Sequence, residues 1–107
     1  MEENLQSEET PLDQEIAQEL VALTPENWRS ICLEITDTSD ANVQRHSHQI
    51  ISLEGYRGVV RPSDALYDAT YKLWLLFKKY GRGWRKATYR VNVEKDGSIR
   101  YTVDFGY

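Results

Sequence analysis

The chain has 107 residues, a formal net charge of −4 and a single cysteine, Cys32. This length is enough for one domain with its own hydrophobic core, and one cysteine excludes an intramolecular disulfide framework. The sequence contains no apolar run long enough to span a membrane and no signal peptide, so we expect a cytoplasmic protein.

The charges are divided unevenly along the chain. Residues 1–56 carry a balance of −10, whereas residues 57–107 carry a balance of +6. Two outcomes are open: the halves neutralise each other on folding, or an acidic surface survives folding and faces a basic partner.

The N-terminal segment 1–11 is acidic and has no apolar period, so we expect a frayed terminus ahead of a single domain over residues 12–107. Leu12–Leu23 predicts a short helix, because its leucines and Ile16 share one face. The Thr24-Pro25 pair then ends this helix.

Two strands are expected next. Trp28–Thr36 alternates apolar and polar residues, as a half-buried strand does. Asp37–Asn42 is dense in turn residues and should reverse the chain. Val43–Leu53 reads as a second strand with weaker alternation, and Gly55–Arg61 as a connection.

The longest helical period of the chain lies in Pro62–Tyr80. Its apolar face consists of Leu66, Ala69, Leu73, Leu76, Phe77 and Tyr80. Pro62 suits the first turn of this helix, and Gly81 suits its end. A second stripe holds Tyr67, Tyr71 and Trp74. This stripe belongs either to the core or to a partly exposed margin, where aromatic residues are typical interface anchors.

The C-terminal segment Trp84–Phe105 predicts a hairpin. A two-residue loop would place the apolar faces of its strands on opposite sides, whereas the three-residue loop Lys95–Gly97 pairs Val93 with Ile99 and joins them on one face. We therefore predict that loop, with Gly97 at positive φ. The predicted fold is α+β: one domain, order α-β-β-α-β-β, with a mostly antiparallel sheet and helices packed on one face.

Few residues point to chemistry. His46 and His48 lie two apart on a predicted strand, so they point to the same side and could bind a metal with a third ligand such as Cys32 or Glu34. The alternative is two surface histidines on the polar face. Nothing in the sequence lowers the pKa of Cys32, and no phosphate loop or metal motif occurs. We expect no enzymatic activity, no metal and no cofactor.

A basic segment, residues 78–90, surrounds Trp84 and includes Lys78, Lys79, Arg82, Arg85, Lys86 and Arg90. Basic residues interleaved with an aromatic residue are typical of nucleic-acid binders. The other interpretation is a solvated helix end beside an edge strand.

Four landmarks occur in order over residues 12–107. They are Thr24-Pro25-Glu26-Asn27-Trp28 after an amphipathic helix, the strand Ile31–Ile35, the helix segment Leu73–Lys79, and Glu94–Ser98 before an aromatic strand that ends at Tyr107. Together they resemble the YezG-like immunity proteins, a DUF600-like family of antitoxins. The resemblance implies a cytoplasmic protein that binds and blocks a cognate toxin, often a nuclease, and that has no catalytic residues of its own.

The expected partner is therefore a basic nuclease domain, and an acidic surface would speed its association. The candidate contact residues are acidic side chains and the aromatic stripe: Glu26, Glu34, Asp37, Asp40, Glu54, Tyr67, Tyr71 and Trp74. The alternative function is a small nucleic-acid-binding protein that uses the basic segment.

Overall fold

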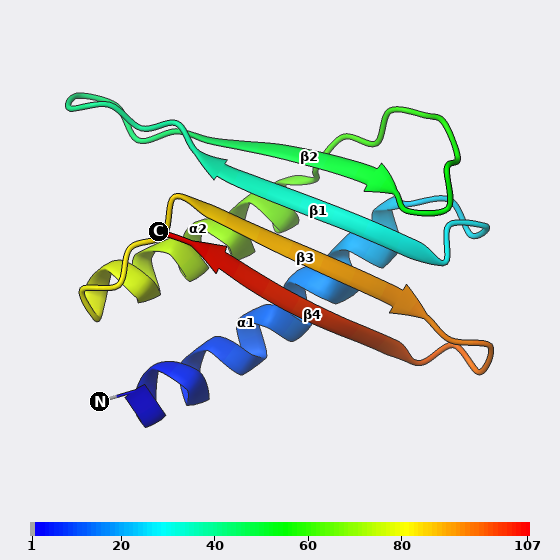
Figure 1. Ribbon diagram of the computed structural model, residues 1–107, viewed down its shortest axis with the longest axis horizontal. Helices are drawn as coiled ribbons and strands as arrows, with labels where there is room; N and C mark the ends of the chain where they lie inside the picture. Colours follow the sequence, from blue (N-terminus) through cyan, green and yellow to red (C-terminus); the bar gives the residue numbers. More distant parts are fainter. Residues whose placement is uncertain (1) are drawn as a thin grey trace.

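A four-stranded antiparallel sheet carries two helices on one of its faces (Figure 1). The computed structural model describes residues 2–107, with side chains from Leu5 onward. In chain order the elements are α1 Glu2–Leu23, β1 Ser30–Asp37, β2 His46–Ser52, α2 Asp64–Lys79, β3 Lys86–Val93 and β4 Ile99–Gly106. This arrangement confirms the predicted α+β fold and element order.

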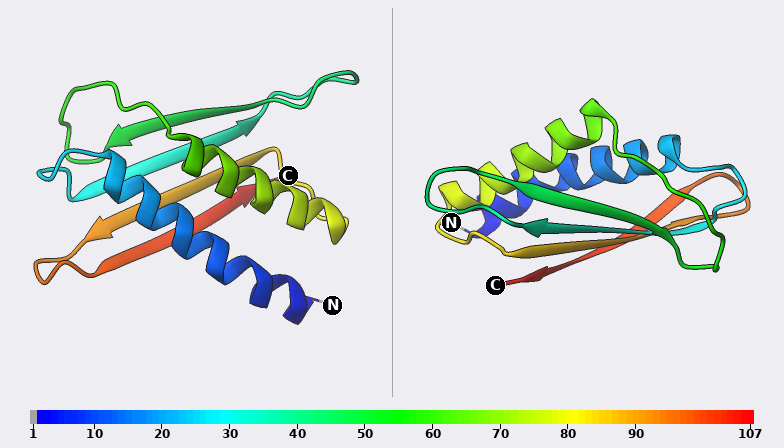
Figure 2. Two further views of the ribbon diagram at one scale, coloured as in Figure 1. Left: turned by 180° about the vertical axis from the view of Figure 1, so that it is seen from behind. Right: turned by 90° about the horizontal axis from the view of Figure 1, so that it is seen from above.

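The strands lie in the order β2-β1-β3-β4, so β2 and β4 form the two edges of the sheet. Both helices cover the same face, and the opposite face is bare (Figure 2, right). Ile31, Leu33 and Ile35 of β1 are fully buried under the helices, as the alternation of this strand predicted. Neither helix in the described part of the chain is long and apolar enough to cross a membrane.

The β3–β4 hairpin has the predicted register. Val93 pairs with Ile99, and the Glu94 N–H donates to the Ser98 carbonyl at 2.8 Å. Gly97 has φ = 87°, a backbone conformation that L side chains rarely adopt. The requirement that the apolar side chains of both strands lie on one face therefore predicted the three-residue loop correctly.

Helix α2 begins two residues later than expected. Ser63 is its N-cap and accepts a hydrogen bond from the Leu66 N–H at 3.1 Å, so Pro62 precedes the helix instead of occupying its first turn. A serine side chain caps more effectively than proline, which explains the shift. Gly81, with φ = 70°, follows the helix as predicted.

Helix α1 starts ten residues earlier than the predicted Leu12. Residue 1 lies outside the described range, but the helix runs from Glu2 with Pro11 inside it, and the Leu5 side chain is buried. Proline is usually found at the start of a helix, and Leu5 alone makes no visible period, so the sequence placed the boundary wrongly.

Contacts with α2 account for the extra helical turns. Glu8 accepts a hydrogen bond from the Tyr80 hydroxyl, and its carboxylate lies 3.7 Å from the Lys79 ammonium. These long-range contacts are invisible to a local pattern. Whether residues 2–11 fray in solution stays a prediction.

Candidate functional site

The five acidic candidates do not gather in one patch. The Glu54 carboxylate lies at the start of β1, where it accepts hydrogen bonds from the Arg29 and Ser30 N–H groups. Asp37 closes the other end of β1, roughly 23 Å away at the rise of a strand. These five carboxylates are therefore spread along β1 and the loops around it.

Most of these carboxylates have local structural partners. Glu34 lies on the bare face, 3.1 Å from the Lys86 ammonium. Asp40 accepts hydrogen bonds from the Asn42 and Val43 N–H groups, both at 2.8 Å. Glu26 is exposed in the α1–β1 loop. The acidic half of the chain, residues 1–56, thus meets the basic half, residues 57–107, in at least the Glu34–Lys86 pair.

Asp37 belongs to the helix-covered side of the sheet. Burial opposes its ionisation, but hydrogen bonds from Ser39, the nearby His46 and the Trp74 indole outweigh burial and lower its pKa. The His46 Nε2 atom lies 3.9 Å from the Asp37 carboxylate. Asp37 therefore holds the end of the β1–β2 hairpin against α2.

The aromatic stripe of α2 divides into two parts. Trp74 is buried, with its ring 5.0 Å from that of His46, so it belongs to the core. Tyr67 and Tyr71 are 46% and 42% exposed. The structure thus leaves two of the three aromatic candidates accessible.

Both exposed tyrosines lie beside β2. The Tyr67 ring meets the His48 ring edge-on at 4.7 Å, and the Tyr71 hydroxyl donates to the Gln44 side chain at 3.3 Å. Three aliphatic side chains of the β2 region are also more than 40% exposed: Val43, Ile51 and Leu53. We call Val43, Ile51, Leu53, Tyr67 and Tyr71 the β2-edge surface.

The two histidines are not on the polar face, which corrects the alternative weighed from the sequence. His46 and His48 point to the same side, as predicted, but that side faces α2: His46 packs on Trp74, and the His48 Nε2 atom lies 2.8 Å from the Thr70 hydroxyl. Cys32 and Glu34 lie on the opposite side of the sheet, since residues of one strand alternate between faces.

This arrangement does not form a metal-binding site. Within residues 2–107, no three His, Cys, Asp or Glu side chains are placed to hold a metal ion. Burial lowers the pKa of His48 to about 4, although the His46 backbone carbonyl opposes this shift, so the ring is neutral at pH 7. Burial likewise lowers the pKa of His46 and raises that of the Cys32 thiol. A thiol with a raised pKa is a poor nucleophile at neutral pH.

The basic segment does not offer an aromatic platform. Trp84 is only 1% exposed, so a base cannot stack on it. Arg90 pairs with Asp104 at 2.9 Å and Lys86 with Glu34. The Lys78 ammonium lies 5.3 Å from the centre of the Trp74 ring. These contacts favour the interpretation of a solvated helix end.

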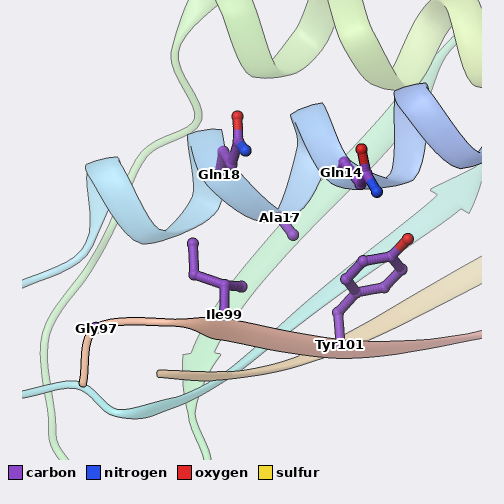
Figure 3. A pocket seen from close by; sticks show the side chains of 6 residues that line it. All are labelled: Gln14, Ala17, Gln18, Gly97, Ile99 and Tyr101. Atoms are coloured by element: carbon purple, nitrogen blue, oxygen red, sulfur yellow. The ribbon is translucent and has the colours of Figure 1, made fainter. Parts of the chain in front are cut away.

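One hollow of about 400 Å³ lies between α1 and the start of β4 (Figure 3). In Figure 3, Gln14 and Gln18 of α1 stand above Ile99 and Tyr101 of β4, with Ala17 between the layers. Two amides and a phenol provide hydrogen bonds, but this lining contains no carboxylate, imidazole or thiol for acid–base or nucleophilic chemistry.

A buried acid next to this hollow was not singled out from the sequence. Asp13 of α1 is 5% exposed and accepts a hydrogen bond from the Tyr89 hydroxyl of β3. Burial, reinforced by the neighbouring Glu9, raises the pKa of Asp13 to about 8. Its position on the apolar side of α1 was the only available signal. The pair fastens α1 to β3.

The β2-edge surface is therefore the candidate site: exposed tyrosines of α2 beside an edge strand, with exposed aliphatic side chains along and beyond that strand. A scan against models of known protein families finds no match to this chain, and a search of curated proteins finds none either.

Proposed function

We propose that this chain is an immunity protein that neutralises a toxin by binding it and covering its active surface. Two facts support the proposal: the landmarks between residues 12 and 107 that resemble the YezG-like antitoxins, and the β2-edge surface. The surface carries most weight, because Tyr67 and Tyr71 are exposed beside an edge strand and exposed aromatic side chains are typical anchors of protein-binding sites.

The proposed partner is a protein with a basic nuclease domain. Its recognition rests on Tyr67, Tyr71 and their aliphatic neighbours, since the acidic candidates are spread along β1 and the loops around it. Individual carboxylates such as Glu26 still contribute long-range attraction to a basic partner.

The test uses a toxin domain, to be sought among the proteins that neighbouring genes encode. We expect co-expression to restore growth and the purified proteins to form a complex. Tyr67→Ala and Tyr71→Ala should each weaken binding about tenfold, equivalent to ~1.4 kcal/mol. Tyr107→Ala is the matched control, because Tyr107 is 66% exposed but follows the opposite edge strand. Normal toxicity in the presence of folded wild-type protein would reject the proposal.

A further inference from the structure

The backbone groups on the outer side of β2 are not paired with another described strand. Within the described residues β2 pairs with β1 alone. The Thr38 N–H donates to the Arg45 carbonyl and the Leu53 N–H to the Ser30 carbonyl, so odd-numbered residues of β2 bond inward. Because the pattern alternates along an antiparallel strand, His46, His48, Ile50 and Ser52 present their N–H and C=O groups outward.

The strand β2 itself carries none of three devices that usually prevent strand addition, and the segment that connects β2 to α2 passes beside only the C-terminal end of its outer side (Figure 1). Natural edge strands are protected by charged side chains, proline or bulges. The β2 sequence, HSHQIIS, contains no charged residue at neutral pH and no proline, and its pairing with β1 is unbroken. The opposite edge strand, β4, carries Arg100 and Asp104 on its bare-face side. The β4 edge of the sheet therefore carries charged side chains, whereas the β2 edge does not.

Apolar side chains flank the outer side of β2 on both faces of the sheet. Ile51 is exposed on the bare face, and Tyr67 and Tyr71 stand on the helix face. Val43 and Leu53 extend this surface past the two ends of β2. Side chains of an added strand would alternate between the tyrosines and Ile51, since successive residues point to opposite faces.

We infer that β2 recognises its partner by strand addition: an extended, largely uncharged segment of the toxin, apolar at alternate positions, pairs with β2 as a fifth strand. Backbone pairing supplies the main-chain contacts, and the β2-edge surface selects the side chains. The inference rests on the proposed function for the identity of the partner. A second copy of this chain in the same place would occupy the surface that the toxin needs, so self-pairing is the competing outcome.

The first experiment follows amide hydrogen exchange in the wild-type chain with and without the toxin domain used to test the proposed function. We expect at least tenfold slower exchange of the outward amides of His48 and Ile50 in the complex. The outward amides of Tyr101 and Val103 on β4 serve as the internal reference and should not change. Sedimentation of the free chain should give a monomer.

The second experiment compares one added charge on each edge. Gln49→Lys and Thr102→Lys both place a lysine at an exposed, bare-face position of an edge strand. Gln49→Lys should weaken toxin binding about tenfold, whereas Thr102→Lys should leave it unchanged. Gln49 pairs with Glu34 and Thr102 with Arg90, so the two lysines face neighbours of opposite sign across the strands. A Gln49→Lys midpoint no lower than that of the wild type therefore shows that weaker binding is not caused by unfolding.

The outcomes separate the two proposals. A toxin complex in which His48 and Ile50 exchange as fast as before would overturn strand addition and leave the immunity function standing. A free chain that dimerises with those amides protected overturns it as well. If the toxin does not bind at all, the function fails, and an extended peptide of alternating valine and threonine becomes the probe. Protection of the same amides by that peptide supports strand addition, and no protection rejects it.

Discussion

The two hairpins of the sheet are fastened to the helices by buried groups of opposite chemistry. In β3–β4, Tyr89 holds the buried carboxyl of Asp13 in α1. In β1–β2, His48 contacts Thr70 of α2. Burial raises the pKa of Asp13 and lowers that of His48, because in each case it disfavours the charged form. High pH therefore weakens the contact between α1 and the β3–β4 hairpin, and low pH weakens the contact between α2 and the β1–β2 hairpin.

The hairpins also differ in what they leave open. β3–β4 ends in a tight turn around Gly97 and exposes a charged edge strand. β1–β2 has a longer loop, held partly by the Asp40 side chain, and exposes an uncharged edge. One sheet thus combines two kinds of hairpin. The register of β3–β4 is determined by its own sequence, whereas the placement of β1–β2 depends on contacts with distant residues.

The largest effect is expected at the Asp13 contact. The folded-state pKa of about 8 lies above the ordinary 3.8, so the stabilisation is complete below pH 4 and is lost as the pH rises through 8. Asp13→Asn keeps an acceptor for Tyr89 but cannot ionise. At pH 8 the variant should exceed the wild type in unfolding free energy by roughly 1–3 kcal/mol, because burial makes ionisation of the Asp13 carboxyl unfavourable in the folded protein.

Urea midpoints at pH 5 and pH 8 measure this effect. The titratable groups around Asp13 are Glu9 of α1, Tyr89 of β3 and Tyr101 of β4. The wild type should lose stability relative to the asparagine variant between pH 5 and pH 8, because only the wild type ionises Asp13 whereas both proteins share the titration of the two histidines. An equal change in the stability of both proteins between pH 5 and pH 8 would show that Asp13 does not titrate in this range.

The second effect has the opposite sign. The folded-state pKa of His48, about 4, lies below its ordinary 6.5, so its contribution is complete above pH 6.5 and is lost as the pH falls through 4. Solvent screening at the edge of the sheet limits the loss between pH 7 and pH 5 to roughly 1–2 kcal/mol.

An NMR titration of the His48 ring tests this directly, and urea midpoints in the Asp13→Asn background isolate the acid-dependent loss. His48→Gln should remove most of that loss, leaving the smaller share of His46, whose pKa is also lowered by burial. A His48 ring that titrates near 6.5 in the folded protein would contradict the buried placement.

The third effect concerns the β3–β4 turn. A Cβ atom at Gly97 meets no atom within 4 Å, so Gly97→Val acts through the backbone alone. The positive φ should cost roughly 1–2 kcal/mol for a β-branched residue. Gly97→Asn is the control, because asparagine tolerates this region better. Equal denaturant midpoints for the valine variant and the wild type would refute the turn assignment.

The contrast between the hairpins also explains which parts of the fold could be predicted from the sequence alone. Strict alternation and one glycine encode the β3–β4 register locally, so Val93–Ile99 pairing was predicted correctly. The start of α1 depends on Glu8 reaching Tyr80, far along the chain, so it was missed. The helix-facing histidines were misjudged because burial of a neutral imidazole depends on the tertiary partner Thr70.

The candidate site was partly visible in the sequence. Tyr67 and Tyr71 were identified from helical spacing, but Trp74, on the same stripe, turned out to be core. Spacing defines a face of a helix and not the element that covers it. The grouping around β2 required the strand order, which hairpin patterns do not give: it depends on how β1 pairs with β3.

The smallest effect is expected at Asp40, in the β1–β2 loop. Two substitutions there distinguish the role of its charge from its role in holding the loop. Its carboxylate accepts hydrogen bonds from the backbone of Asn42 and Val43, and these bonds lower its pKa. Asp40→Asn removes the charge but keeps an acceptor, whereas Asp40→Ala removes both. Asp40→Ala should reduce stability less than Gly97→Val does, because the loop is exposed to water.

Association with the toxin domain decides which role matters. If Asp40 positions Val43 for the β2-edge surface, only the alanine variant should bind more weakly, with faster amide exchange at Asn42 and Val43. If Asp40 instead attracts a basic partner, both variants should associate more slowly than the wild type, and added salt should narrow the gap. Stopped-flow kinetics at two ionic strengths distinguish the cases. We expect the first result, since the structure gives this carboxylate two backbone donors within its own loop.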